Sequence, residues 1–367
     1  MRHPLIDAVS WSKRSGIILF IMLAIATCPS LAQSQSNQAG APFELVRSPR
    51  DVEEINRQRV GIVTGQADLA YVRIGNDLSR LVDTDERPPF RVVTQLGYGS
   101  MRNLDDLRNL RNVDFAIVQS DVFEAYKNSP ESYADLNRYV RIVASLYKEK
   151  VHLLARGDVE DIRSLAGKRV NIGIPGSGHN MTARNLFRKL GIQVEYDEQN
   201  TTTAVQNVID GTIDAALFVA GGPMKTVADI NYGVVYSEGL HFVPINDEFS
   251  DMIGYQPAKI NVQDYDTLAK PFKPIPTLSV EALLVAHVWD AGDPRDAAVE
   301  RFVDRFYKNS AKLVSPDFSP GTRLLWCQTD LSGSLKGWMR LPYADKWLDD
   351  HKDVVRVLHD AGGKDCS

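Results

Sequence analysis

The chain has 367 residues, of which 44% are hydrophobic and 24% are charged, and its formal net charge is −5. That length suits two domains of ordinary size, and the mildly acidic balance argues against the basic surface of a nucleic-acid-binding protein. The 3 cysteines and 7 histidines show no spacing typical of a metal site, so we expect neither a metal nor a cofactor.

The N-terminus has the three parts of a secretory signal peptide. Arg2, Lys13 and Arg14 supply positive charge, residues 16–26 form an uncharged apolar run, and Ser30-Leu31-Ala32 offers the small residues of a cleavage site. The apolar run is too short for a comfortable membrane span. We therefore predict that residues 1–32 are removed and that the protein is exported to the periplasm.

Two alternatives for this segment stay open. The first is an uncleaved N-terminal anchor. The second is a lipid anchor on Cys28, which is disfavoured because Thr27 stands where a small Gly or Ala is usual. Residues 33–49 are polar and without periodicity, which is typical of a flexible tail.

Strands and helices are expected to alternate through the first half of the chain. Hydrophobic periodicity and turn residues predict a strand at 59–64, a helix at 71–82, a strand at 91–96, a helix at 103–110 and a strand at 113–118. Ser120 or Asp121 can cap the helix that follows.

The same order recurs in the second half. A strand is expected at 169–174, a helix at 181–190, a strand at 193–197, a helix at 201–209 and a strand at 213–219. Thr201 to Thr203 are expected to cap the helix at 201–209. The pattern apolar–Asp–x–Ala–apolar–apolar occurs in both strands that close the halves, which indicates a duplicated architecture.

Two long extended runs, at 140–155 and 278–287, suit passage between the halves. Helices at 295–309 and 343–359 would then complete the first lobe. Alternating strands and helices favour parallel sheets with right-handed crossovers. We predict an α/β protein with two mostly parallel sheets joined by a hinge, divided into lobe 1 (50–145), lobe 2 (146–275) and a return to lobe 1 (276–367). Such a hinge permits closure on a ligand.

A glycine-rich loop at 173–180 follows a buried strand and opens a helix, an arrangement that aims backbone N–H groups at an anion. It is not a Walker A loop, because His179 and Asn180 replace the required Lys and Ser/Thr. It is not a dinucleotide fingerprint, because Met181 replaces the third glycine. Nor is it a nucleophile elbow, because Pro175 replaces the glycine before Ser177. A carboxylate- or phosphate-sized anion remains, as does a turn that binds nothing.

Five turns follow predicted strands, at 64–65, 97–100, 119–121, 173–178 and 220–223, and should surround one cleft because ligands of open α/β sheets bind at the carboxyl ends of the strands. For each polar side chain the alternative is helix capping or packing. The predicted ligand-binding residues are Thr64, Gly65, Tyr71, Ser100, Asn103, Gln119, Ser120, Gly176, Ser177, Gly178, His179, Asn180 and Arg184.

Cys327 and Cys366 are the two cysteines left after processing. In an oxidising compartment an even pair favours a disulfide that ties the C-terminal tail to the body. Two free thiols are the alternative.

The order of motifs resembles the TAXI family of solute-binding subunits of tripartite ATP-independent periplasmic (TRAP) transporters. The resemblance runs from about residue 59 to 348 and rests on Asn103-Leu104, on residues 114–121, on Val170-Asn171-Ile172-Gly173 with Gly176-Ser177-Gly178, and on the ending at 337–348. It implies a two-lobed type II periplasmic binding protein that closes on glutamate or a related dicarboxylate and delivers it to a TRAP membrane permease. Asp68 departs from the Gly- and Thr-rich first turn of that family, and its negative charge leaves room for an amino acid ligand.

On these grounds we expect a solute-binding protein for a small organic anion or amino acid, without catalysis. One alternative is a periplasmic sensory protein that binds its ligand and signals to a membrane partner. A remote alternative is a periplasmic serine hydrolase that pairs Ser177 or Ser100 with a histidine. The available bases would be His152, His179, His241 and His287.

Overall fold

The computed structural model describes residues 54, 57–66, 70–86, 89–127, 129–249, 251–265, 267–268, 273–353, 357–358, 360 and 366. The predicted signal peptide, the polar tail, Cys28 and Asp68 lie outside these residues. All elements below belong to the compact unit Arg47–Ser367. No helix within the described ranges is long and apolar enough to cross a membrane.

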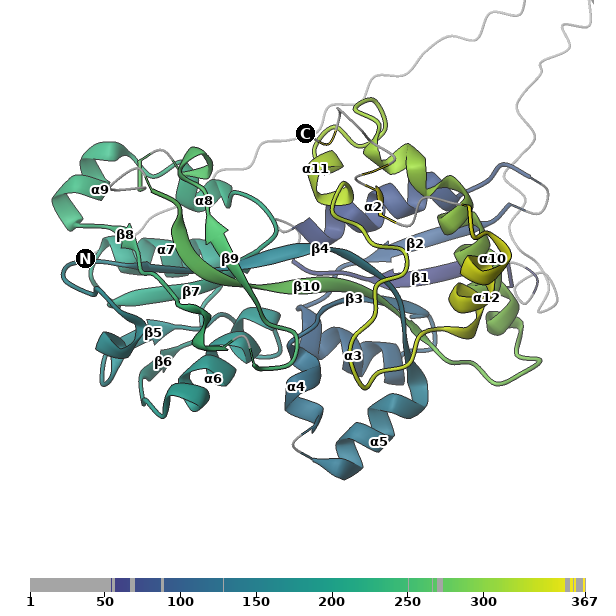
Figure 1. Ribbon diagram of the computed structural model, residues 1–367, viewed down its shortest axis with the longest axis horizontal. Coiled ribbons are helices and arrows are strands. Elements are labelled where there is room, and N and C mark those ends of the chain that lie inside the picture. The colour runs from purple at the N-terminus through teal and green to yellow at the C-terminus, as the bar shows by residue number, and fades with distance from the viewer. Residues whose placement is uncertain are drawn as a thin grey trace, which may run out of the picture. The chain divides into compact units, whose positions relative to one another are not determined.

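The first half of the chain alternates strands and helices as predicted (Figure 1). Strands β1 and β3 are near-continuous apolar runs and are buried on both faces, whereas β2, at the edge of the sheet, is partly exposed. In chain order the elements are β1 (Arg59–Val63), α2 (Ala70–Val82), β2 (Arg91–Gln95), α3 (Ser100–Asn109), β3 (Phe115–Gln119), α4 (Val122–Lys127) and α5 (Pro130–Tyr139).

The second half begins with the long strand β4 and repeats the alternation. Its elements are β4 (Val140–Ala155), η1 (Ile162–Leu165), β5 (Arg169–Asn171), α6 (Gly178–Leu190), β6 (Glu195–Asp197), α7 (Thr201–Ile209), β7 (Ala215–Ala220), α8 (Lys225–Ala228), α9 (Tyr232–Glu238), β8 (His241–Phe242), η2 (Asp247–Phe249), β9 (Gln256–Ile260) and η3 (Val262–Asp264). The chain then returns through β10 (Ile275–His287), α10 (Pro294–Asn309), η4 (Ser310–Val314), α11 (Arg323–Trp326) and α12 (Pro342–Asp350).

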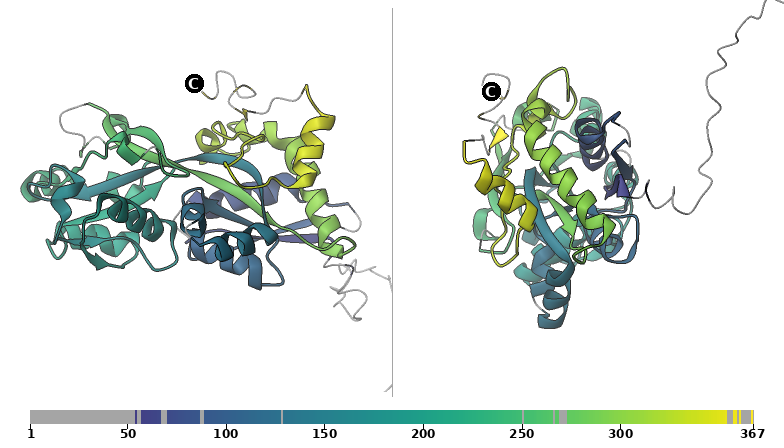
Figure 2. Two further views of the ribbon diagram at one scale, coloured as in Figure 1. Left: turned by 60° about the horizontal axis from the view of Figure 1, so that its bottom comes forward. Right: turned by 90° about the vertical axis from the view of Figure 1, so that its right-hand side faces the viewer.

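The α/β class is confirmed, but the prediction of two separate sheets is wrong. The described strands form one mixed sheet in the order β2-β1-β3-β10-β4-β7-β5-β6, with β8 added to β4 and β9 to β10. The joining strands β4 and β10 pair with each other antiparallel from Lys150–Ser279 to Val140–His287. Because β10 also pairs with β3 and β4 with β7, hydrogen bonding continues from one half to the other (Figures 1 and 2).

Parallel pairing persists on either side of this antiparallel centre. Strand β1 is parallel to β2 and β3, and β5 is parallel to β6 and β7. We call these the β1 half and the β5 half of the sheet. The carboxyl ends of their strands carry the turns that were expected to form a cleft.

Two local predictions are corrected. Helix α12 ends at Asp350 rather than at residue 359. The N-cap of α7 is Asn200, whose side chain accepts from the Thr203 N–H at 3.0 Å, so the threonines themselves lie inside the helix. Asn is among the strongest N-cap residues, and it takes this role one position earlier than predicted.

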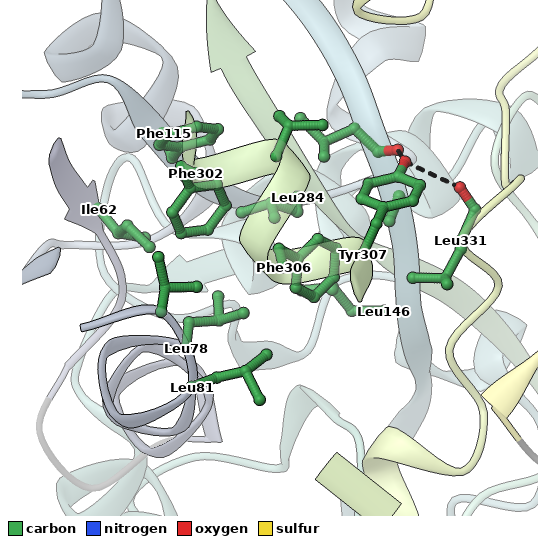
Figure 3. Packing of buried hydrophobic residues seen from close by; sticks show 14 of the residues in the cluster. Ile62, Leu78, Leu81, Phe115, Leu146, Leu284, Phe302, Phe306, Tyr307 and Leu331 are labelled. Carbon is green, nitrogen blue, oxygen red and sulfur yellow. Dashed lines mark hydrogen bonds between the residues drawn. The ribbon is translucent and has the colours of Figure 1, made fainter. Parts of the chain in front are cut away.

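The core under the β1 half joins helices from both ends of the chain. Figure 3 shows Phe302, Phe306 and Tyr307 of α10 packed among side chains of β1, α2 and β3. The Phe115 and Phe302 rings lie 4.2 Å apart between centroids. Tyr307 is buried, and its hydroxyl donates to the Val143 carbonyl at 2.6 Å and lies 3.0 Å from that of Leu331. The phenol therefore satisfies backbone groups that the sheet leaves open.

The C-terminal segment is fixed to the β1 half at α11. The Trp326 Nε1 donates to the buried Asp77 carboxylate at 2.9 Å, and the Thr322 hydroxyl donates to the same oxygen. Cys327 and Cys366 form a disulfide. These contacts hold Arg323, between Thr322 and Trp326, at a defined place on the wall of the site described next.

Candidate ligand-binding site

A cavity of about 1080 Å³ lies where the turns at the strand ends converge. All five predicted turns contribute to its lining, through Gly65, through Gly99 with Ser100, through Gln119, through Ser177 with Gly178, and through residues 220–223. The remaining walls come from the centre of β4 and from residues 320–328. The cavity is of the size that holds a small metabolite.

The glycine loop of the β5 half touches the β1 half directly. The Arg102 N–H donates to the Gly176 carbonyl at 3.1 Å, and a Cβ on Gly99 would meet the Ser177 Cα at 3.1 Å. A side chain at Gly178 would overlap the Gln119 Oε1 atom. A larger residue at 178 would therefore have to displace the Gln119 amide from the start of α6.

Ser177 is the N-cap of α6. Its Oγ accepts from the Asn180 N–H at 3.2 Å, and its own N–H donates to the Ile174 carbonyl. The side chain therefore performs the capping role that was the alternative to ligand contact. The next residues, Gly178 and His179, begin the helix at the edge of the cavity, where the helix dipole favours negative charge.

Gln119 presents an amide at the end of β3. Its backbone N–H donates to the Ser100 Oγ at 3.0 Å, and that hydroxyl also lies 3.5 Å from the Gln119 Oε1. The Gln119 side chain is buried, and its Nε2 has no hydrogen-bond partner among the described residues. A buried amide donor without a partner is costly, so a ligand acceptor would satisfy it.

Two histidines line the cavity in the neutral form. Burial lowers the pKa of His179 to about 4 and that of His152 to about 3. The His179 Nδ1 accepts from the Val219 N–H at 2.9 Å, so its proton resides on Nε2. His152 is held between the Lys150 carbonyl and the Tyr265 hydroxyl.

A buried carboxyl group lies on the β4 wall. Glu149 is 5% exposed, and its Oε2 accepts from the Tyr71 hydroxyl at 2.8 Å. The pKa of Glu149 is raised to about 8, mainly by burial; the Tyr71 hydrogen bond lowers it in part, and the nearby Asp121 contributes to the rise. Burial, together with the Glu149 charge, also raises the pKa of Tyr71.

A cation also lines the cavity, in the C-terminal segment at residues 320–328. Arg323 is partly buried, and its Nη1 atom has no hydrogen-bond partner in the part of the chain that the structure describes. Of the other cations in the lining, Lys150 pairs with Asp264 at 3.8 Å and Lys225 with Asp229, while Arg73 and Lys148 are exposed to solvent. Arg323 is therefore well placed to meet a ligand anion.

The structure brings seven of the predicted residues to the cavity. They are Gly65, Tyr71, Ser100, Gln119, Ser177, Gly178 and His179. The other six predicted residues do not line it, and four of them stabilise the frame of the β1 half or the loop. Gly176 accepts from Arg102 as described, and the Asn103 Nδ2 donates to the Thr64 and Ile117 carbonyls, the latter at 2.8 Å. Ser120 bridges Gly254 and Glu281 beside the joining strands.

The remaining two residues form an ion-pair network outside the cavity. The Arg184 Nη2 lies 2.7 Å from the Glu198 Oε1, and its Nε donates to the Asn180 Oδ1 at 2.8 Å. The Asn180 Nδ2 donates to Glu198 and to the Gly173 carbonyl. Arg184 therefore stabilises the glycine loop through Asn180 and Glu198 and does not line the cavity.

Sequence reasoning missed Glu149 and Arg323. A signal for the first was present, because Lys148-Glu149-Lys150 interrupts an otherwise apolar strand, and a charge in a strand buried on both faces needs a reason. Arg323 gave no signal, because its distance along the chain from the glycine loop hides their shared cavity.

With this geometry established, comparison with known proteins places the chain in a family. The NMT1-like family matches residues 62–291, more than half of the chain, so the protein belongs to the NMT1-like family. The matched range runs from the end of β1 through β10 and contains all seven predicted residues that line the cavity.

Solved structures of binding proteins show a distant likeness. A ligand-binding component of an ABC-type import system from Staphylococcus aureus is 14% identical, with a TM-score of 0.45 over 83% of this chain and 95% of that one. A putative periplasmic sulfonate-binding protein from Methylobacillus flagellatus is 11% identical, with a TM-score of 0.38 over 79% and 76%. An amino acid ABC transporter substrate-binding protein from Streptococcus pneumoniae, bound to L-arginine, is 11% identical, with a TM-score of 0.38 over 69% and 91%. Likeness at this level says nothing of the ligand.

Proposed function

We propose that this protein is a periplasmic solute-binding protein that captures a small organic anion or amino acid and delivers it to a TRAP membrane permease. The observation that carries the proposal is the convergence of five strand-end turns, from both halves of one sheet, on a single cavity of about 1080 Å³. The TAXI resemblance of the motifs supports the permease as partner.

The lining suits an anionic group. The start of α6, the neutral His179 with its Nε2 proton, the unpartnered Gln119 amide and the Arg323 guanidinium all offer donors. Charge-assisted hydrogen bonds from Arg to carboxylate are among the strongest that a binding site can form.

The joining strands favour capture by closure. Only β4 and β10 carry the backbone between the β1 half and the helices around β5, and the halves meet across the cavity in the Arg102–Gly176 hydrogen bond. Between them Thr182 of α6 donates to Asp121 at 2.6 Å, and the Tyr255 hydroxyl donates to the same carboxylate at 2.7 Å. Further bonds join Ser120 to the Gly254 carbonyl and the Ile253 N–H to Glu124. All of these contacts lie outside the ladder of β4 and β10, so opening of the cavity would break them and leave the sheet intact.

The hydrolase alternative is disfavoured by the same geometry. Ser177 uses its hydroxyl to cap α6, and Ser100 uses its own on Gln119. Both cavity histidines are hydrogen-bonded to other groups, and among the described residues no hydrogen bond joins a histidine to either serine. A sensory role requires the same cavity and differs only in the membrane partner.

The test is a thermal-shift panel of amino acids, dicarboxylates, keto acids and phosphate. A ligand at about 100 times its Kd adds roughly 2.7 kcal/mol to the free energy of unfolding, which raises Tm by several degrees for a protein of this size. Arg323→Gln should remove the shift, whereas Arg138→Gln, at an exposed position outside the cavity, should keep it. Absence of any shift with every compound, or an unaltered shift in Arg323→Gln, would refute the proposal as stated.

A further inference from the structure

The cavity contains a carboxylate that forms no ion pair with any described residue. Glu149 is nearly fully buried at the centre of β4, and its carboxylate lies in the cavity lining. Among described residues no Lys, Arg or His nitrogen forms an ion pair with it within 4.0 Å, and the Tyr71 hydroxyl is its hydrogen-bond donor. Of its neighbours on the strand, Lys148 is exposed and Lys150 pairs with Asp264.

The groups closest to Glu149 are phenols and another acid, while the exposed Arg73 of α2 lines the same cavity near Tyr147. Tyr71 comes from α2, Tyr147 from β4 itself, and Asp121 from the turn after β3. An ionised carboxylate in such surroundings is strongly destabilised unless a cation joins it. The Tyr71 hydroxyl nevertheless donates to it, which favours the ionised form and leaves the other oxygen as an acceptor for a ligand donor.

The lining also contains hydrogen-bond donors that lack acceptors. The Arg323 Nη1 and the Gln119 Nε2 are buried donors without partners in the described ranges. A dicarboxylate would satisfy these donors but would place negative charge beside Glu149. A ligand that carries both a carboxylate and an ammonium group can satisfy these donors and Glu149 together.

From this juxtaposition we infer that Glu149, positioned by Tyr71, forms a subsite for the ammonium group of the ligand, so that the captured solute is an amino acid rather than a dicarboxylate. This rests on the proposed solute-binding function and deepens it by naming the ligand class. Asp68, which first suggested an amino acid from the sequence, plays no part in the argument.

The experiment compares acids matched in length that differ in the amino group. The probes are L-glutamate against glutarate, L-aspartate against succinate, and L-leucine against 4-methylpentanoate, with affinity measured by isothermal titration calorimetry at pH 6, 7 and 8. We expect at least one amino acid to bind, and its deaminated partner to bind at least tenfold more weakly, because a hydrogen bond to a charged group is worth a factor of about 10 to 150.

The pH dependence gives a second, independent readout. Because the unliganded Glu149 pKa is about 8, the ionised fraction rises from about 1% at pH 6 to about half at pH 8, and the amino acid affinity should rise about fiftyfold over that interval. Glu149→Gln should weaken amino acid binding at least tenfold and abolish this rise. Tyr71→Phe should shift the rise to higher pH, since it removes a hydrogen bond that favours ionisation. Glu160→Gln, an exposed control, should change neither the affinity for the amino acid nor its pH dependence.

The outcomes separate the inference from the function beneath it. If a deaminated acid binds as tightly as its amino acid, or binds more tightly as the pH falls, solute binding stands and the ammonium subsite is refuted. If Glu149→Gln retains full affinity and the pH dependence, the subsite is also refuted. If no compound of this panel or the earlier one binds, the proposed function fails, and the ammonium subsite fails with it.

Discussion

Glu149 gives the most direct test of the electrostatics of the cavity, because its effect on folding can be measured without knowing the ligand. A Glu149→Gln substitution keeps the size of the side chain and an oxygen that accepts from Tyr71. It removes only the ability to ionise. The folded protein should then no longer suffer the cost of a buried charge.

The sign and size follow from the pKa values. Glu149 titrates at about 8 in the folded protein and near 4.5 when unfolded. Its raised pKa means that the folded state binds the proton more tightly, so wild-type stability is greatest below about pH 4.5 and falls as the pH rises toward 8. Over that range the loss is about 4 kcal/mol, of which about 3 kcal/mol falls between pH 5 and pH 8.

The assay is urea unfolding of wild type, Glu149→Gln and the exposed control Glu160→Gln at pH 5 and pH 8, without ligand. From pH 5 to pH 8, the free energy of unfolding of Glu149→Gln should rise by about 3 kcal/mol relative to that of wild type. All other titrating groups cancel in this comparison. A difference below about 1 kcal/mol would show that Glu149 is solvated or already paired with a cation, and the reasoning about its pKa would be refuted.

Two further substitutions test the contacts between the halves and the glycine loop. Tyr255→Phe removes one of the two hydroxyls that donate to the buried Asp121, and should lower the free energy of unfolding by about 2 kcal/mol at pH 8. The loss should be smaller at pH 5, because burial raises the Asp121 pKa to about 6 and Asp121 is therefore mostly protonated at pH 5. Urea unfolding of wild type and Tyr255→Phe at both pH values measures this difference. Gly178→Ala should cost about 1–3 kcal/mol, since the new Cβ displaces the Gln119 amide, whereas Gly222→Ala, with open space around its Cβ, should leave the free energy of unfolding unaltered.

Either result can contradict the structure. An equal loss at both pH values in Tyr255→Phe would mean that Asp121 does not change its protonation in that range. Equal stability of the Gly178 and Gly222 variants would mean that α6 does not lie against Gln119.

Local patterns predicted the elements closely. The run at 140–155 is β4 with the same bounds, and the helix at 201–209 is α7 with the same bounds. These segments have strong periodicity or continuous apolar runs, and such signals depend on the segment alone. The end of α12 was predicted too late because a helical pattern can continue where packing does not support it.

The site could be predicted in part for a similar reason. Turns after parallel strands must share one edge of the sheet, so Ser100, Gln119 and Gly178 could be brought together from topology alone. Which polar side chain turns inward could not, because Asn180 and Arg184 find a closer partner in Glu198. A sequence does not show which of two nearby acceptors lies nearer in space.

By itself the sequence determined the α/β alternation, the duplicated order and the glycine loop at residues 173–180, because each depends on residues close together in the chain. Tertiary structure alone decided that β4 and β10 pair with each other and fuse the strands into one sheet. It also placed Glu149 and Arg323 in the same cavity. Burial and the absence of a charge partner arise from contacts between distant segments, and those contacts turn an ordinary glutamate into a group that titrates near pH 8.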